Sequence, residues 1–137
     1  MMSRILIAVD GSEYADKAFG FAVDLAINTR SNLLIMHVFE ELGNIGYSIN
    51  KEIERDNREM LQRYKTRAKE ALVHTNVDAI ESRGTDAAEE ILKMAKKESI
   101  DAIVLGSRGV GKTKESLLGS ITYKISHSAD RPIIIVR

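Results

Sequence analysis

A glycine-rich and basic segment between residues 106 and 120 has the composition best suited to chemistry in this chain. Glycines stand at positions 106, 109, 111 and 119, and three cations, Arg108, Lys112 and Lys114, lie among them. Glycine allows the backbone to turn its N–H groups toward an anion, and a helix N-terminus favours phosphate. We therefore expect this segment to hold phosphate groups. A surface loop with no ligand is the alternative interpretation.

Two motifs overlap in this segment and predict different mechanisms. The string that ends in Gly111-Lys112-Thr113 matches the P-loop pattern G-x-x-x-x-G-K-T, which would make the chain a nucleotide phosphohydrolase. A P-loop leads directly into a helix, but the residues that follow Lys112 are polar and show no apolar face. The other pattern is Gly106-x2-Gly109-x9-Gly119-Ser120, which ends where the last helix is expected to begin. We favour this second pattern.

Asp10 is the second candidate for ligand binding, because it directly follows the apolar run Ile5–Val9 and precedes Gly11-Ser12. A carboxylate accepts hydrogen bonds from ribose hydroxyls and also binds Mg²⁺. A simple turn residue is the alternative interpretation. His37 lies inside another apolar run, and we interpret it as a hydrogen-bonded core residue rather than a catalyst.

A catalytic or metal-binding set is not visible in the sequence. There is no cysteine and no G-x-S-x-G motif, and no two of the three histidines have the spacing of metal ligands. We therefore predict no catalytic residue and no metal site. Any hydrolysis of a bound nucleotide should be slow, because no residue is placed to activate water.

The elements that would position these residues alternate regularly along the chain. Runs rich in Ile, Val and Leu predict strands buried on both faces, and apolar residues three or four apart predict amphipathic helices between them. The expected strands cover residues 5–9, 33–39, 77–83, 102–105 and 133–136, with 77–83 at an edge. The expected helices cover residues 13–28, 51–73 and 86–97, and a last helix runs from about 119 to before Pro132.

Some details of these elements can also be predicted. Ser12 is expected to cap the first helix, and Thr85 or Asp86 the third. From the last helix, we expect Leu118, Ile121 and Ile125 to face inward. Residues 40–50 form the longest irregular stretch, which we expect to be a loop.

Strands that alternate with helices predict an α/β fold with a parallel sheet, right-handed crossovers and helices on both faces. We expect a single Rossmann-like domain over residues 1–137, with five strands in the order 3-2-1-4-5. In open sheets of this kind, ligands bind beyond the carboxyl ends of the strands, where the winding reverses. Asp10 and the glycine-rich segment both follow strand ends, which places them at this edge.

The composition argues against several classes of function. Of 137 residues, 44% are apolar and 29% charged, which is typical of a folded globular domain. Lys plus Arg and Asp plus Glu both number 20, so general nucleic-acid binding, which needs a basic excess, is disfavoured. Because the apolar stretches are all shorter than a membrane span, we expect no membrane association and a cytoplasmic location.

The chain resembles the universal stress protein family, in its ATP-binding branch, over nearly its full length. The resemblance rests on the G-x2-G-x9-G-S spacing and on five segments: Ile5–Ser12, His37-Val38, Val104–Ser107, Leu118–Ser120 and Arg131–Val136. It implies that ATP lies in the crevice between the first and fourth strands, with ADP and AMP as alternatives and Mg²⁺ as a companion ion.

The resemblance also implies roles for individual residues. The adenosine part of the nucleotide would lie against Ala8, Val9, Asp10, Val38, Leu105 and Gly106. The phosphates would be held by backbone N–H groups of Gly109, Gly119, Ser120 and Ile121, with the Ser120 hydroxyl as a further donor. The chain departs from the family at Gly84-Thr85-Asp86, where similar proteins often have Gly-x-Pro. An acidic Asp86 would repel phosphates unless it caps its helix and points away.

These implications favour an ATP-binding regulatory protein of the stress response, whose nucleotide state alters the binding of partner proteins. The resemblance also implies a homodimer, in which the terminal apolar strand Ile133–Val136 pairs with its twin. Two alternatives remain open: a P-loop phosphohydrolase that uses Gly111-Lys112-Thr113, and a dimeric interaction module that binds no nucleotide.

Overall fold

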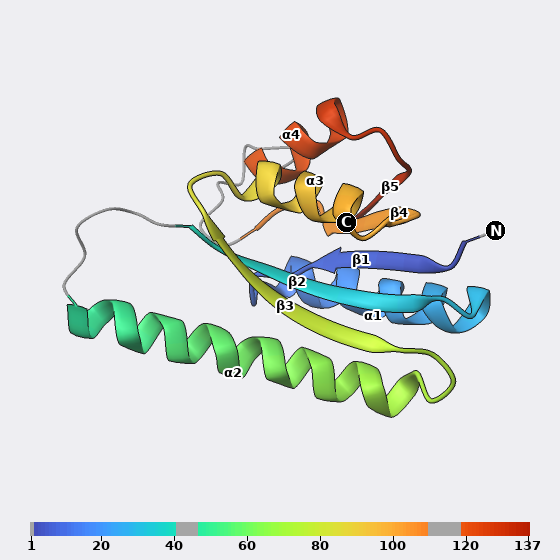
Figure 1. Ribbon diagram of the computed structural model, residues 1–137, viewed down its shortest axis with the longest axis horizontal. Coiled ribbons are helices and arrows are strands. Elements are labelled where there is room, and N and C mark those ends of the chain that lie inside the picture. The colour runs from blue at the N-terminus through green and yellow to red at the C-terminus, as the bar shows by residue number, and fades with distance from the viewer. Residues whose placement is uncertain (1, 41–46, 110–118) are drawn as a thin grey trace.

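A five-stranded parallel sheet organises the chain, and its order is β3-β2-β1-β4-β5 (Figure 1). The computed structural model describes residues 2–40, 47–109 and 119–137. The predicted fold class and strand order are therefore confirmed. The strands are β1 (Arg4–Ala8), β2 (Asn32–Glu40), β3 (Val77–Gly84), β4 (Ala102–Gly106) and β5 (Ile133–Val136).

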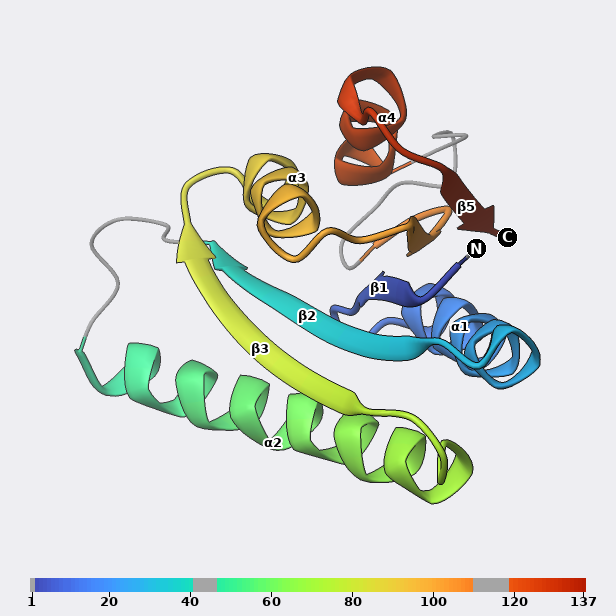
Figure 2. The ribbon, with the colours of Figure 1, turned by 45° about the vertical axis from the view of Figure 1, so that its right-hand side comes forward.

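Helices cover both faces of the sheet, as Figure 2 shows most directly. α1 and α2 pack on one face, and α3 and α4 on the other. Their bounds are α1 (Glu13–Thr29), α2 (Tyr47–Ala71), α3 (Ala87–Lys97) and α4 (Ser120–Ser128). On β1, Ile5 and Ile7 belong to the core under α1 and α2, while Leu6 belongs to the core under α3 and α4. This two-sided burial explains why the strand is apolar at every position.

Side-chain caps fix where two of the helices begin. The Ser12 hydroxyl accepts a hydrogen bond from the Ala15 N–H at 3.1 Å, which confirms the predicted cap of α1. Asp86 caps α3 and accepts from the Glu89 N–H at 3.2 Å. Gly119 is the N-cap of α4 and supplies no side chain to the N–H groups of the first turn.

Two details of the predicted elements are wrong. α2 begins at Tyr47, within the stretch 40–50 that was expected to be a loop. The prediction missed this turn because the apolar periodicity that marks the helix starts only at Ile53, and Ile53 is itself exposed. On α4, Ile121 is exposed instead of facing inward, and the buried positions are Thr122 and Ile125. The inward position that the sequence pattern assigned to Ile121 is thus taken by its polar neighbour Thr122.

The two edges of the sheet differ in cover. β3 forms one edge, as predicted, and α2 packs against it (Figure 1). β5 forms the other edge, and its four apolar residues are only half-buried. Within the described part of the chain, every helix is too short or too polar to span a membrane.

Candidate functional site

The candidate site lies where the chain reverses the direction in which it adds strands. β1 has β2 on one side and β4 on the other, so the strand order turns back at the β1–β4 pair. Ile7 is the register partner of Val104, so the residues that follow on each strand leave the sheet side by side. Asp10 and Gly106 therefore reach the same edge, which is where open α/β sheets bind ligands.

Gly106 occupies a position where two helices approach the end of β4 closely. A Cβ atom built on Gly106 would lie 2.9 Å from the carbonyl carbon and oxygen of Tyr14, on the first turn of α1. From the other face, the Thr122 hydroxyl of α4 donates a buried 2.8 Å hydrogen bond to the Gly106 carbonyl. Glycine at this position is required by packing, because backbone atoms cannot move aside for a side chain.

The structure brings Asp10 and Gly109 into direct contact. One carboxylate oxygen of Asp10, Oδ1, accepts a 2.9 Å hydrogen bond from the Ser12 N–H. The other, Oδ2, would lie only 2.7 Å from a Cβ atom on Gly109. The carboxylate that ends β1 is thus held by its own turn and lies against the backbone that follows β4. A side chain at position 109 would collide with it.

Gly119, at which the described chain resumes, lies beside Gly109. Its N–H donates to the Ser107 carbonyl at 2.7 Å, and a Cβ atom on it would lie 3.4 Å from the Gly109 nitrogen. The start of α4 therefore lies beside Gly109 and, through it, beside Asp10. Ser120 and Ile121 follow on the exposed first turn of α4, where backbone N–H groups have no acceptor within the helix.

Val38 lies on β2, which is on the opposite side of β1 from β4 and Gly106. It is half-buried and packs with Ala8 in the core under α3 and α4. Its neighbour His37 is buried, and His37 Nδ1 lies 2.8 Å from the Val9 carbonyl oxygen. His37 is therefore a hydrogen-bonded core residue, as predicted.

The loop after β3, where the chain departs from the resemblance at Asp86, forms an ion pair with α4. Asp86 caps α3 through Oδ1, and its Oδ2 pairs with Lys124 of α4. The hydrogen bond from Lys124 and the N–H of Glu89 hold the pKa of Asp86 below its usual value. The Asp86 charge is thus neutralised by Lys124 and by the cap of α3. Such a cap is the condition under which Asp86 was expected not to repel phosphates.

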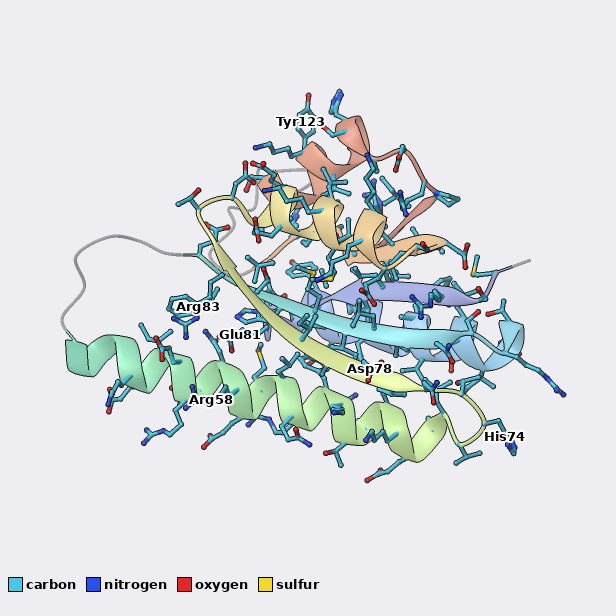
Figure 3. All side chains as sticks on the ribbon, viewed as in Figure 1. Arg58, His74, Asp78, Glu81, Arg83 and Tyr123 are labelled. Carbon is cyan, nitrogen blue, oxygen red and sulfur yellow. The ribbon has the colours of Figure 1, made fainter. Side chains whose placement is uncertain are left out.

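Polar contacts join α2 to β3 and to α1. Arg83 of β3 forms a 3.0 Å ion pair with Glu54 of α2 and lies over the Phe39 ring at 5.2 Å. Figure 3 shows Arg83 and Glu81 pointing from β3 toward α2. Deeper in, the Tyr64 hydroxyl donates a 2.5 Å hydrogen bond to Asp16 of α1. Burial and this hydrogen bond raise the pKa of Tyr64 well above its usual value.

A separate hollow lies at the other end of the strands, near the starts of β2 and β3. It has a volume of about 560 Å³ and is lined by the end of α1, including Ile27, and by residues that follow α2, including Leu72 and His74. Figure 3 shows His74 far from Arg83, which marks the carboxyl ends of the strands. The hollow is therefore not part of the candidate site.

Sequence reasoning located the strand-end residues but missed the residues that support them. Tyr14, Thr122 and Lys124 hold the site together through contacts between elements far apart in sequence. Thr122 was missed because the sequence pattern assigned the inward position to its apolar neighbour Ile121. The P-loop candidates Gly111, Lys112 and Thr113 lie outside the described residues, so that motif stays untested.

Comparison with known proteins identifies similar chains that match over nearly their full length. The model of the universal stress protein family matches residues 1–137. Universal stress protein YxiE from Bacillus subtilis is 34% identical over 151 residues, which cover 100% of both chains. The solved structure of protein MJ0577, from Methanocaldococcus jannaschii, is 28% identical with a TM-score of 0.80 and covers 99% of this chain and 96% of that one.

Other structures with the same fold contain adenine nucleotides. A universal stress protein in complex with cAMP has a TM-score of 0.77 at 19% identity, with 98% and 97% of the chains covered. A universal stress protein from Archaeoglobus fulgidus in complex with dAMP has a TM-score of 0.73 at 18% identity, with 100% and 98% covered. A family protein from Arabidopsis thaliana with AMP bound has a TM-score of 0.69 at 16% identity, with 98% and 90% covered.

Proposed function

Because the chain belongs to the universal stress protein family, we propose that it is a stress-response regulator that binds an adenine nucleotide, ATP first among them. The nucleotide would lie at the carboxyl edge of the sheet, between β1 and β4, and would be held by the G-x2-G-x9-G-S loop. Its presence would alter the binding of partner proteins. ADP and AMP are alternative ligands of the same site.

The observation that carries the proposal is the meeting of Asp10, Gly109 and Gly119 at the reversal of the strand order. Gly109 contacts the Asp10 carboxylate on one side and Gly119 on the other. A carboxylate that accepts ribose hydroxyls is thus placed next to a helix start that favours phosphate. These two chemistries, side by side, are the ones a nucleotide requires. The relatives that contain cAMP, dAMP and AMP support this proposal through the shared fold.

The proposal divides the site between the two ends of the ligand. The nucleoside end would contact the ends of β1, β2 and β4, at Ala8, Val9, Asp10, Val38, Leu105 and Gly106. The phosphate end would be held by backbone N–H groups of Gly109, Gly119, Ser120 and Ile121. Gly106 has a second role in this arrangement, because its missing side chain lets α1 and α4 close on the strand end.

Mg²⁺ would enter with the nucleotide rather than bind to a site of its own. Among the described residues, no three His, Cys, Asp or Glu side chains are grouped to hold a metal. Mg²⁺ commonly keeps several waters and bonds to one or two carboxylates and to phosphate oxygens. Asp10 is a carboxylate that could bind the Mg²⁺ ion in this way. Any hydrolysis would be slow, because we find no residue placed to activate water in the part of the chain that the structure describes.

Equilibrium binding of labelled ATP tests the proposed function directly. Saturable binding is expected, and its absence at millimolar nucleotide would overturn the proposal. The glycine loop further predicts that Gly119→Ala and Ser120→Ala weaken binding more than Lys112→Ala does. The reverse ranking would favour the P-loop alternative. Competition by ADP, AMP and cAMP against labelled ATP would then rank the ligands.

We also propose that β5 joins two copies of the chain into a homodimer. β5 is an edge strand whose apolar residues are only half-buried, and such an edge needs cover. The carbonyls of Pro132 and Val136 bond to β4, so the N–H of Ile135 points to the open edge. Ile135→Pro removes that N–H and is expected to convert the dimer to a monomer. Light scattering that gives the wild-type chain a monomer mass at micromolar concentration would contradict the proposal.

A further inference from the structure

The hydrogen-bond ladder between β1 and β2 stops one step before the strands part. The Val9 N–H donates to the Met36 carbonyl at 2.9 Å, but the register of the two strands ends at Ala8 and Met36. In a parallel ladder, a residue that donates to one position on its neighbour accepts from the position two residues further on. The next rung would therefore be a bond from the Val38 N–H to the Val9 carbonyl.

The His37 side chain takes the place of that missing rung. His37 Nδ1 lies 2.8 Å from the Val9 carbonyl oxygen, and the imidazole is buried. A carbonyl oxygen can only accept, so Nδ1 carries the hydrogen and donates it. The Val9 carbonyl is thus satisfied by a side chain of β2 instead of by the β2 backbone.

The Val38 N–H faces the gap that this substitution leaves open. Along β2, the Asn32 N–H donates to Ser3 before β1, and the Leu33 N–H donates to Asn76 before β3. Even-numbered residues of β2 therefore present their backbone toward β1, and odd-numbered ones toward β3. Val38 is even-numbered, so its N–H points toward the end of β1, where His37 instead of Val38 donates to the Val9 carbonyl.

We propose that His37 is a positioning residue that keeps the Val38 N–H available as a hydrogen-bond donor to a ring nitrogen of the adenine base. This inference rests on the proposed nucleotide site and gives that site a specific device for base recognition. Without the imidazole, the shortest way to satisfy the buried Val9 carbonyl is for the Val38 N–H to close the rung. Closing it would extend the sheet and remove the donor from the base.

Three substitutions at position 37 separate this role from simple packing. His37→Leu removes every donor. His37→Gln keeps the length of the side chain but moves its donor to the position of Nε2. His37→Asn loses the ring volume but places its amide nitrogen where Nδ1 stood, so it can still donate to the Val9 carbonyl. His74→Leu, at the other end of the strands, is the matched control.

ATP affinity and hydrogen exchange of the Val38 amide are the two measurements. We expect His37→Leu and His37→Gln to bind ATP about tenfold more weakly, as the loss of one hydrogen bond implies, and to exchange the Val38 amide about tenfold more slowly. His37→Asn should bind within about threefold of wild type despite a larger loss of stability from its lost volume. A packing role alone would instead make affinity follow stability.

The outcomes distinguish this inference from the proposed function. If His37→Gln, folded by circular dichroism, binds ATP as wild type does, or if its Val38 amide exchanges at the wild-type rate, the inference is overturned. If the wild-type protein binds no ATP, the proposed function fails whatever the exchange data show. If His37→Leu does not fold, the comparison of Gln with Asn still decides the question.

Discussion

Replacement of Gly109 by alanine is the sharpest test of the geometry at the strand ends. The added methyl group would lie 2.7 Å from Asp10 Oδ2, a distance well inside van der Waals contact. The carboxylate must then rotate or the backbone must withdraw. Rotation endangers the 2.9 Å bond from the Ser12 N–H to Asp10 Oδ1, and withdrawal separates Gly109 from Gly119. Either response disturbs the groups that would hold the two ends of a nucleotide.

The size of the effect follows from the bonds at risk. A hydrogen bond to a charged group contributes about 1.5–3 kcal/mol, so the loss of the carboxylate's contact with the ligand should weaken ATP binding about 10- to 100-fold. The crowding itself should cost less folding free energy than a clash with backbone would, because the Asp10 carboxylate is the movable end of a side chain. Titration calorimetry with ATP and thermal unfolding of the same samples measure the two quantities separately.

Gly20→Ala is the matched control for this substitution. Gly20 lies inside α1, and a Cβ atom on it would have no neighbour within 4 Å. Alanine in a helix interior is expected to stabilise the protein by about 0.5–1 kcal/mol and to leave ATP binding unchanged. The reasoning is refuted if Gly109→Ala remains folded and binds ATP as tightly as Gly20→Ala and the wild type.

Three further substitutions test the contacts around the site. Gly106→Ala should cost about 1–3 kcal/mol of stability in denaturant titrations, because its methyl group meets the Tyr14 backbone at 2.9 Å; a neutral effect would contradict the packing described. Tyr64→Phe should lower the free energy of unfolding by about 1 kcal/mol at neutral pH, because the bond to Asp16 is lost. The raised pKa of Tyr64 stabilises the fold only while the phenol keeps its proton. The variant should therefore lose less stability than the wild type as the pH rises above about 10. Asp101→Asn should lower stability at neutral pH, because N–H groups of Ser3 and Arg4 hold the pKa of Asp101 below its usual value; the variant should lose less stability than wild type as pH falls through about 4, and equal acid sensitivity would disprove this assignment.

The sequence predicted the elements more accurately than the contacts between them. Short, continuous apolar runs such as Ile5–Val9 favour strands that are covered on both faces. Ser12 is a residue type that commonly caps helices, so its position predicted the start of α1. The start of α2 at Tyr47 had no such signal, because the apolar periodicity that predicted this helix begins only at Ile53. Local patterns therefore predict local structure only where burial imposes a period.

The residues that hold the site together could not be predicted from the sequence, for a different reason. The bond from Thr122 to the Gly106 carbonyl, and the approach of Tyr14 to Gly106, depend on how α1 and α4 settle on the sheet. Nothing in the local sequence of these helices specifies that distance. The same holds for the bond between His37 and Val9, which joins residues 28 positions apart. Each arises from the relative placement of whole elements.

The central position of β1 has a consequence for how the protein is made. β1 leaves the ribosome before the other four strands of the sheet, yet its neighbour β4 follows only after β2 and β3, on the other side, have been synthesised. Arg4 and Asp101, which join the two strands at their start, are 97 residues apart. At about 5–20 residues per second, translation leaves one side of Ile5, Leu6 and Ile7 without its partner strand for roughly 5–20 seconds. During that time, the edge of β1 that will pair with β4 has no hydrogen-bond partner from its own sheet.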